Sequence, residues 1–496
     1  MGGPRNRVLM IAVDAAELSF IRASLTSLPT FRRLLTEGAL FPLRSSAEHI
    51  AASVWPTMYT GESPGEHGIS QHIQWDPERM RMRRITSDWI YSEPFWYDIA
   101  RAGLGVTVLD VPFTFENRLP QAVELNNWGS HDLMGKFGAN PASLHREIRR
   151  RFGHHPMGYE IPVNKDTRQL ATIKQECVVG AGTKGRLARW LRDITKWDFY
   201  LTVFGECHRG GHVLWRDHDE AHAHVPKGAL LEVYQAVDAA VGHVIEGVDT
   251  DSTTIGVVSL HGMGHNFSQE HFVRRSMDRI NASFLRTVLA ARDDANSSRR
   301  GLVRGLRESV PAQFQHAVAR AVPVGVRDWV VGREVTGGID WKRTPGLALR
   351  SDLYSFIRLN VIGRERLGFL EAGSGALCRY VEHVTNCFLN LRTIGTNAAV
   401  VRDVVLLQDV FTGSRRQLLP DLLVRWTNEY PAAAVHSPKL GLIRGAPDSG
   451  RTGEHRPDGF ALMLGRRVKE HGLPPLVHNS DFPRFVSHLL GVRTGR

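Results

Sequence analysis

Histidine and acidic residues follow the apolar segments of this chain in a pattern typical of a metal site. His208 and His212 stand four residues apart in FGECHRGGHVLW (204–215), directly after the apolar run FYLTVF. At this spacing both imidazoles share one face if a helix begins there, although Gly210 and Gly211 weaken such a helix. Imidazole with a few carboxylates suits Zn²⁺, and Mn²⁺ or Fe²⁺ are also possible. One histidine pair is a weak signal, so a histidine-rich surface turn remains the alternative.

Other strand-like segments also end in residues that could bind a metal. Asp14 follows RVLMIAV, Asp110 follows GVTVL, and His261 follows TTIGVVSL, while Glu206 stands just before His208. In an open parallel sheet, ligands bind outside the carboxyl ends of the strands. We therefore expect these side chains to meet at one edge of the sheet, which strengthens the prediction of a metal site.

A stretch rich in hydroxyl groups, ASVWPTMYTGESPGEHGI (52–69), offers a nucleophile. The oxygen of Ser53 or Thr57 could bind a metal and lose its proton, which would remove the need for a separate base. The alternative is a helix cap and turn in which the hydroxyls bind backbone amides. Local chemistry alone favours the turn.

Alternating strands and helices are expected to position these residues. Strand patterns occupy 7–15, 104–113, 196–206 and 252–262, and a helical pattern occupies 28–39. This alternation predicts an α/β fold with a doubly wound, mostly parallel sheet.

The second half of the chain has a different pattern. Residues 270–335 are amphipathic without a strand signal, which predicts a helical insertion or cap. The strand patterns at 400–409 and 419–426 suggest that the sheet then resumes. We expect a core first part at 1–269, the cap at 270–335, and a core second part at 336–496.

The composition narrows the class of protein. The formal charge of +11 suggests affinity for anions such as phosphate, although the scattered arginines could simply solvate the surface. No aromatic and basic residues interleave as in single-strand nucleic-acid grooves, so specific nucleic-acid binding is not expected. Four cysteines without a CxxC pair, no signal sequence and no long apolar run predict a cytoplasmic protein that does not enter a membrane. The sequence leaves the oligomeric state open.

Taken in order, several motifs resemble one known family. They are VDAAE, LPTFRRLLTEGA, SVWPTMYTGESPGEHGI, DVPFTF, GECHRGGHVLWRDHD, SLHGMGHN, LPDLLVRW and GEHRPDGFAL. The chain resembles the alkaline phosphatase superfamily, and most closely its type I phosphodiesterase/nucleotide pyrophosphatase-like branch. The resemblance implies a two-metal hydrolase of phosphate esters. It places Asp14 and His261 at one metal, and His212 and His455 at the other.

Three departures from the family pattern bear on the mechanism. His208 stands where the family has an aspartate, and Leu260 replaces the aspartate before His261. The nucleophile position falls on Ala51 or, by another count, on Val54, and Ser53 is the nearest hydroxyl.

These departures weaken the metal centre at Asp14 and His261, which Glu206 or Asp110 could support. A three-imidazole zinc site at His208, His212 and His455 is also plausible, and there a metal-bound water could replace the missing hydroxyl.

The leading hypothesis is therefore a metal-dependent hydrolase of a phosphodiester or phosphomonoester, with one or two Zn²⁺ ions and a small-molecule substrate. Arg358, in a basic stretch, and Asp110 are candidates for substrate binding. Two alternatives remain. One is a phosphoryl or other group transferase on the same fold, and the other is a degenerate member that binds a ligand or partner without turnover.

Overall fold

A large α/β lobe holds the chain's main sheet. The computed structural model describes residues 6–492 except 91, 116–118, 131–133, 159, 161–163, 217–223, 290–323, 350, 352, 428–431, 448 and 470–472. The strands of the sheet are β1 (Arg7–Val13), β2 (Ala39–Leu43), β5 (Val106–Leu109), β6 (Ala122–Asn126), β7 (Gly138–Asn140), β8 (Phe199–Phe204), β9 (Thr253–Ser259) and β19 (Gly459–Leu464). Within the described residues their order is β2-β19-β9-β1-β8-β5-β6-β7.

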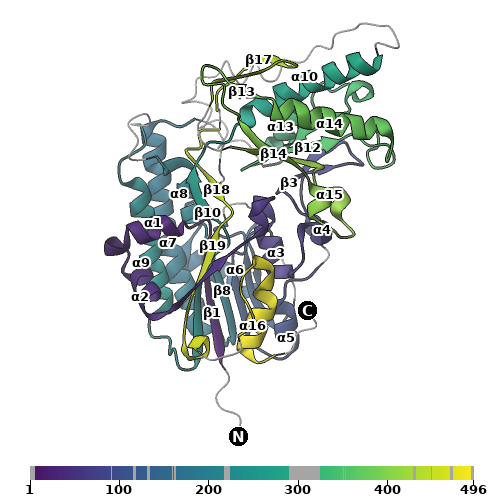
Figure 1. Cartoon of the computed structure of the whole chain (residues 1–496). Coiled ribbons are helices and arrows are strands. Elements are labelled where there is room, and N and C mark those ends of the chain that lie inside the picture. Colours follow the sequence, from purple (N-terminus) through teal and green to yellow (C-terminus); the bar gives the residue numbers. More distant parts are fainter. Residues whose placement is uncertain are drawn as a thin grey trace.

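Parallel strands form the centre of this sheet. Neighbouring strands from β9 to β6 run parallel. β19 is antiparallel to both β9 and β2, and β7 is antiparallel to β6. The prediction of an α/β fold with a mostly parallel sheet is confirmed (Figure 1).

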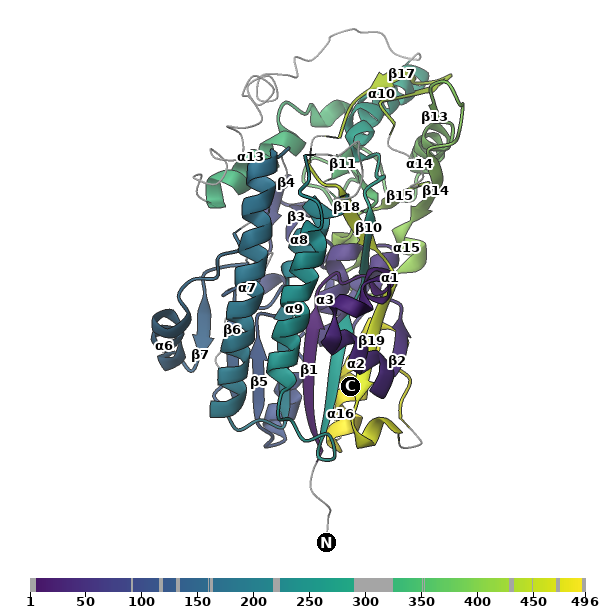
Figure 2. The same ribbon diagram turned by 90° about the vertical axis from the view of Figure 1, so that its left-hand side faces the viewer.

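Helices cover both faces of the sheet (Figure 2). One face carries α1 (Leu18–Ala23), α2 (Pro29–Glu37), α6 (Ser143–Phe152), α7 (Thr167–Ile194), α8 (Glu206–Leu214) and α9 (Ala229–Ile245). The other face carries α3 (Val54–Thr60), α5 (Trp96–Arg101) and α16 (Phe482–Leu490).

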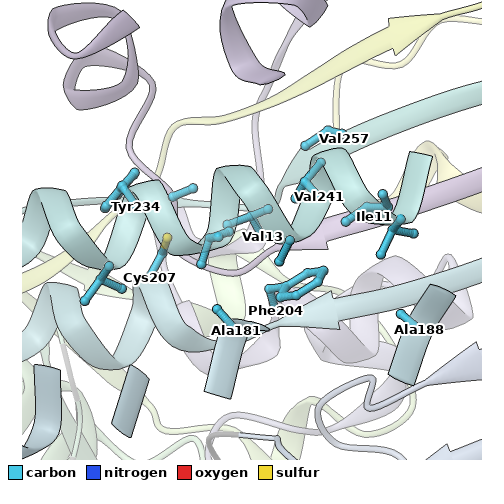
Figure 3. Close-up of a cluster of buried hydrophobic side chains, with 14 of the residues drawn as sticks. Ile11, Val13, Ala181, Ala188, Phe204, Cys207, Tyr234, Val241 and Val257 are labelled. Atoms are coloured by element: carbon cyan, nitrogen blue, oxygen red, sulfur yellow. The ribbon is translucent and has the colours of Figure 1, made fainter. Parts of the chain in front are cut away.

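The central strand β1 shows why this arrangement requires continuous apolar runs. Its odd residues from Leu9 to Val13 pack with α7 and α9, and its even residues from Val8 to Ala12 pack with α3, α5 and α16. Side chains alternate along a strand, so a strand covered on both faces must be apolar throughout. Figure 3 shows the cluster that includes Leu9, where Ile11 and Val13 lie with Phe204 of β8, Ala181 of α7 and Val241 of α9.

A small antiparallel pair of strands follows the central sheet. β10 (Gly262–His265) pairs with β18 (Gly453–Arg456), and this register sets Met263 opposite His455. β18 leads directly into β19, so a segment from near the end of the chain reaches the carboxyl end of β9.

A second lobe lies between β10 and β18 in the sequence. Its helices and strands are α10 (Glu270–Leu289), α13 (Val324–Thr336), β11 (Gly346–Leu349), β12 (Ser355–Leu359), α14 (Gly375–Leu389), β13 (Arg392–Thr393), β14 (Val401–Leu406), α15 (Leu407–Val410), β15 (Leu422–Trp426), β16 (Ala434–Ser437) and β17 (Gly441–Arg444). The strands form two antiparallel sheets, β11-β12-β15-β14 and β13-β16-β17.

The second lobe differs from its prediction in one respect. α10 and all but the last residue of α13 fall within the helical insertion expected at 270–335, of which residues 290–323 lie outside the described residues. The strands expected to resume the main sheet, β14 and β15, belong instead to the separate sheet of this lobe, and β19 alone rejoins the main sheet after residue 336. The lobe also packs on the hairpin of β3 (Ile73–Asp76) and β4 (Arg81–Arg84), and the short helix α4 (Pro64–His67) follows α3.

No helix in the described part of the chain is both long enough and apolar enough to cross a membrane.

Candidate metal centre

Four imidazole rings and one carboxylate meet where β1, β8 and β9 end. Asp14 follows β1, His261 follows β9, and His208 and His212 lie on α8, directly after β8. His455 comes from β18. All five side chains are buried. The structure therefore brings together five residues that the sequence predicts as metal ligands.

Two glycines allow α8 to lie against β18. A side chain at Gly453 would collide with the backbone oxygen of Gly211, and a Cβ atom at Gly211 would lie 2.9 Å from the side chain of Met263. The backbone amide of Thr452 donates to the carbonyl oxygen of His212 at 2.7 Å and so joins the end of α8 to the start of β18. Gly211, one of the two glycines that weaken the predicted helix, thus permits with Gly453 the close approach that sets His212 beside His455.

Hydrogen bonds determine which nitrogen of two histidines faces the cluster. Nδ1 of His212 lies 3.0 Å from the carbonyl oxygen of Gly453, which can only accept, so this nitrogen carries the proton. Nδ1 of His208 lies 2.7 Å from Oδ2 of Asp14 and donates in the same way. In their neutral forms both rings therefore turn an unprotonated Nε2 toward the cluster.

The Nε2 atoms of three rings lie close together, and the neutral His455 ring presents a third lone pair there when its proton is on Nδ1. Nε2 of His208 is 3.0 Å from Nε2 of His212 and 3.3 Å from Nε2 of His455. Burial, reinforced by Arg451 for His212 and by the other imidazoles for His455, lowers the pKa of both rings well below the ordinary value. Protonation is thus disfavoured, and a metal cation is the group that fits between the lone pairs.

The spacing of the three Nε2 atoms suits zinc. Tetrahedral Zn²⁺ with Zn–N distances of about 2.0–2.1 Å sets its nitrogen ligands about 3.3–3.4 Å apart. The separations of 3.0 and 3.3 Å are close to this value. The donor atoms of His208, His212 and His455 form a group within 4.8 Å of one another, so these residues fit the metal that the resemblance implies.

A second group, formed by Asp14, His208 and His261, is less complete. Oδ1 of Asp14 lies 3.6 Å from Nε2 of His261 and accepts a hydrogen bond from Trp55 Nε1 at 3.2 Å. The same nitrogen of His208 cannot both donate to Asp14 and bind a cation. Leu260, where a second carboxylate would stand, is buried in an apolar cluster. This group therefore has one carboxylate and is a weaker site for a divalent cation.

Neither predicted nucleophile contacts the imidazole cluster in the described structure. The hydroxyl of Ser53 is fully buried and donates to the carbonyl oxygen of Ile50 at 2.7 Å. Thr57 is also fully buried, with Oγ1 3.0 Å from Nε2 of His67. Both hydroxyls are engaged locally, but with a carbonyl oxygen and an imidazole and not with the backbone amides of the predicted cap and turn.

His67 cannot act as a base toward Thr57. Its Nδ1 accepts a hydrogen bond from the backbone amide of Ile69 at 3.1 Å, so its Nε2 carries the proton and donates to Thr57. Burial, together with Arg415, lowers the pKa of His67 to about 3. The ring is neutral at ordinary pH and has no free lone pair to take the threonine proton.

Ala51 precedes the helix that contacts Asp14. It opens a 3-10 turn that runs into α3, and Trp55 of α3 donates its indole N–H to Asp14. Ala51 and Leu260 are both buried in the apolar cluster on this face of the sheet, so apolar side chains occupy the places of the family's nucleophile and second aspartate.

Two other predicted site residues, Glu206 and Asp110, have hydrogen-bond partners outside the imidazole cluster. Glu206 accepts a hydrogen bond from His155 Nε2 at 3.0 Å and is not among the grouped donor atoms. Asp110 accepts from the amides of Trp128 and Gly129 and pairs with the buried Lys184 at 2.8 Å. Neither lies in the position that its predicted role requires.

Arg358 lies in the second lobe and is fully buried on β12. It donates to Glu365 at 2.8 Å and to the carbonyl oxygen of Leu419 at 2.5 Å. Like Asp110, it belongs to an internal ion pair of the fold, and the proposed contact with substrate is corrected accordingly.

The sequence gives no sign of a further acidic residue beside His212. Oε2 of Glu160 lies 3.9 Å from Nε2 of His212. Arg451 binds both oxygens of Glu160, at 2.6 and 3.0 Å, and also donates to Glu454 at 3.1 Å. Glu160 stands in a loop with no motif around it, although Arg451 could be noticed because it lies four residues before His455.

Burial and neighbouring charges shift the pKa values of the ionisable groups around this ion pair. Burial raises the pKa of the Glu160 carboxyl, but Arg451 and His212 outweigh it and hold the pKa well below the ordinary value. Burial, together with Arg209, lowers the pKa of the nearby Lys165 to about 7. The surroundings of Glu160 and Arg451 are therefore densely charged, whereas Ala51 and Leu260 are packed among apolar side chains.

The fold and the site together define a member of the alkaline phosphatase superfamily with a buried imidazole cluster at the end of its parallel strands. The sequence profile named type I phosphodiesterase/nucleotide pyrophosphatase matches residues 8–352. The chain belongs to this family, and the assignment points to the hydrolysis of phosphate esters. The matched range contains Asp14, His208, His212 and His261, whereas His455 lies beyond it.

Two solved structures of one enzyme support the fold. Phosphonoacetate hydrolase from Sinorhizobium meliloti 1021 has been crystallised with phosphonoformate and with phosphonoacetate. These two structures have a TM-score of 0.50 at 13% and 14% identity, with 98% of this chain and 96% of theirs covered. An inactive form of murine ectonucleotide pyrophosphatase/phosphodiesterase 5 in complex with AMP has a TM-score of 0.48 at 11% identity, with 98% and 96% covered. A search of curated proteins finds no match.

Proposed function

We propose that this protein hydrolyses phosphate esters with one divalent cation, Zn²⁺, held by His208, His212 and His455. The main support for this proposal is that the Nε2 atoms of these three buried side chains lie close together. Nε2 of His208 is 3.0 Å from that of His212 and 3.3 Å from that of His455. When bound, the cation polarises a phosphoryl oxygen and lowers the pKa of water at its open position to about 7. Membership of the phosphodiesterase family supports the choice of substrate class.

The protein's own groups keep the imidazoles in position. Asp14 accepts the Nδ1 proton of His208, and Gly453 accepts that of His212, so neither ring must reorient when a cation binds. Ser53 and Thr57 are engaged within the fold, and Ala51 has no hydroxyl. We therefore propose that water, and not a side chain, attacks phosphorus.

Metal analysis and ester cleavage test this function together. The protein is stripped with a chelator, reloaded separately with Zn²⁺, Mn²⁺ or Fe²⁺, and assayed with bis(p-nitrophenyl) phosphate and p-nitrophenyl phosphate. We expect about one Zn²⁺ per chain and restored cleavage of one of the two esters. The choice between them distinguishes a diesterase from a monoesterase.

Two variants complete this experiment. We expect His212→Ala to lose the metal and to reduce turnover at least a hundredfold. His243→Ala is the matched control, because His243 lies on α9 with 44% of its side chain exposed. A folded His212→Ala protein that keeps both its metal and its activity would contradict the proposal.

Ala51 and Leu260 favour a second candidate, a member that binds a phosphate-ester ligand without turnover. Their apolar side chains remove the family's nucleophile and one carboxylate. If this second candidate is correct, the zinc-loaded protein binds a phosphonate such as phosphonoformate but releases no nitrophenol from either of the two nitrophenyl esters. Binding is measured by calorimetry, with His212→Ala as the control that should lose it.

A further inference from the structure

Glu160 is an acidic residue beside the imidazole cluster that the family pattern does not identify. Glu160 places Oε2 3.9 Å from Nε2 of His212, the nitrogen that faces the proposed cation. The neighbouring carboxylates approach other nitrogens: Asp14 lies against Nδ1 of His208, and Glu454 lies 3.5 Å from Nδ1 of His455. Of these three contacts, that of Glu160 joins a carboxylate to an Nε2 atom.

A cation in this cluster would lack a negatively charged ligand. His208, His212 and His455 are neutral when they bind a metal, and Asp14 is occupied in orienting His208. Burying a divalent charge among neutral groups is costly unless an anion is close by. A carboxylate is an ordinary fourth ligand to zinc beside imidazoles, at about 2.0–2.2 Å.

Arg451 holds Glu160 in its present position. It binds both carboxylate oxygens of Glu160, while its bond to Glu454 gives it a second acidic partner. If Glu160 turned toward the cluster, Arg451 would still be neutralised by Glu454. The ion pair therefore competes with metal binding for Glu160 without making its release prohibitive.

We propose that Glu160 is a fourth protein ligand of the metal centre formed by His208, His212 and His455, with water entering as a fifth ligand, and that Arg451 competes with the metal for Glu160. This inference rests on the proposed function, because it requires a cation at the three imidazoles. It goes beyond that function in assigning an acidic ligand from a loop before α7. It also assigns Arg451 the role of limiting metal affinity.

Cobalt titration tests this assignment without measuring activity. Co²⁺ is added to the metal-free protein, and the visible absorption bands report both affinity and the set of ligands. We expect Glu160→Gln to weaken Co²⁺ binding at least tenfold and to change the shape of the bands. We expect Glu160→Asp, which keeps the charge but shortens the reach, to bind with intermediate affinity.

Arg451→Gln distinguishes a ligand from a purely structural partner. If Glu160 binds the metal, removing its competitor leaves the Co²⁺ affinity equal to or above that of the unaltered protein. If Glu160 acts only as a charge near the cation, Glu160→Gln lowers the Co²⁺ affinity but leaves the shape of the absorption bands unchanged, and this result overturns the assignment. Glu232→Gln is the control for the loss of one carboxylate, since Glu232 pairs with Lys174 and half of its side chain is exposed.

The possible results separate the two proposals. Circular dichroism and thermal unfolding of the metal-free variants confirm that each remains folded. Unaltered protein that binds no Co²⁺ overturns the proposed function and this inference together. Unaltered protein that binds Co²⁺ while Glu160→Gln shows the same affinity and spectrum overturns only the assignment of Glu160.

Discussion

Nδ1 of His208 lies 2.7 Å from Oδ2 of Asp14, in a hydrogen bond between a buried imidazole and a buried carboxylate. This bond keeps the proton on Nδ1 and leaves Nε2 free to face His212 and His455. The family pattern places an aspartate at position 208 and makes Asp14 a direct ligand. Here Asp14 accepts a hydrogen bond from the histidine that replaces that aspartate, and we propose that it orients this ring for metal binding.

Asp14→Asn should weaken metal binding without destroying the fold. Asparagine can still accept a hydrogen bond from His208, but it lacks the charge that makes the imidazole a better ligand. Outer partners of metal-binding histidines typically contribute about 10–100-fold in metal affinity. We expect a loss of about tenfold, measured by competition with a zinc chelator.

Asp238→Asn provides the comparison for Asp14. Asp238 is equally buried and binds the backbone amides of Thr30 and Phe31 at the start of α2, on a different part of the sheet. Its replacement should lower stability but leave zinc affinity unchanged. Equal zinc affinities for both variants would show that the Asp14 hydrogen bond does not support the metal centre.

A second metal should appear when the family's missing groups are restored. Ala51→Thr supplies the hydroxyl and Leu260→Asp supplies the carboxylate beside Asp14 and His261. We expect the double variant to bind about two zinc ions per chain, measured by elemental analysis, and Ala51→Thr alone to bind one.

The loss of stability that Leu260→Asp causes in the metal-free protein provides a second test of this prediction. Leu260 is buried in an apolar cluster, so an unpaired aspartate there should destabilise the metal-free protein by about 3–5 kcal/mol. Added zinc should recover much of this loss in thermal unfolding. If the double variant binds a single ion, positions 51 and 260 do not face Asp14 as inferred.

The metal centre is largely predictable from the sequence because its ligands follow long apolar runs. β1, β8 and β9 are buried on both faces, so their sequences are continuously apolar, and parallel strands must end at one edge of the sheet. Asp14, His208 and His261 follow directly from this geometry. His455 needs the family resemblance, because the pairing of β18 with β10 leaves no mark in the local pattern.

Other features depend on partners distant in the sequence. Glu160 stands in a loop, and Arg451, which positions it, comes from the far end of the chain. Asp110 is correctly placed at the end of a strand, but Lys184 binds it internally. β14 and β15 have the hydrophobic pattern of core strands, and that pattern does not specify which of two sheets they join.

His67 should make the protein less stable in acid. Its pKa is about 3 in the folded chain, against an ordinary value of 6.5, because burial and Arg415 disfavour the charged ring. Below pH 6.5 the unfolded chain therefore binds more protons at this residue, and stability falls as the pH decreases toward 3. One such group contributes a slope of up to about 1.4 kcal/mol per pH unit.

His67→Gln should reduce this slope. Glutamine can still donate to Thr57 but has no proton to gain in this range. Urea unfolding between pH 7 and pH 4 measures the free energy of unfolding for both proteins. We expect the variant to be less stable at pH 7, with the difference narrowing as the pH decreases. A constant difference at every pH would show that His67 does not remain neutral in the folded chain.

Lys184→Met should destabilise the protein without changing how it binds substrate. Nζ of Lys184 pairs with Asp110 at 2.8 Å and donates to the carbonyl oxygen of Val203 at 2.8 Å, and both charged side chains are buried. Methionine leaves the Asp110 carboxylate without its cation, which should cost about 3–5 kcal/mol. We expect this loss in urea unfolding, while the KM of the folded enzyme stays within twofold.

Lys174→Met, on the same helix, is the control. Lys174 pairs with Glu232, whose side chain is half exposed, and such pairs contribute about 0–1 kcal/mol. If Asp110 were a substrate-binding group instead, Lys184→Met would alter KM, because removing its cation changes the charge that a phosphate ester meets. A changed KM with little loss of stability would therefore restore the sequence-based assignment of Asp110 and contradict the internal ion pair as its role.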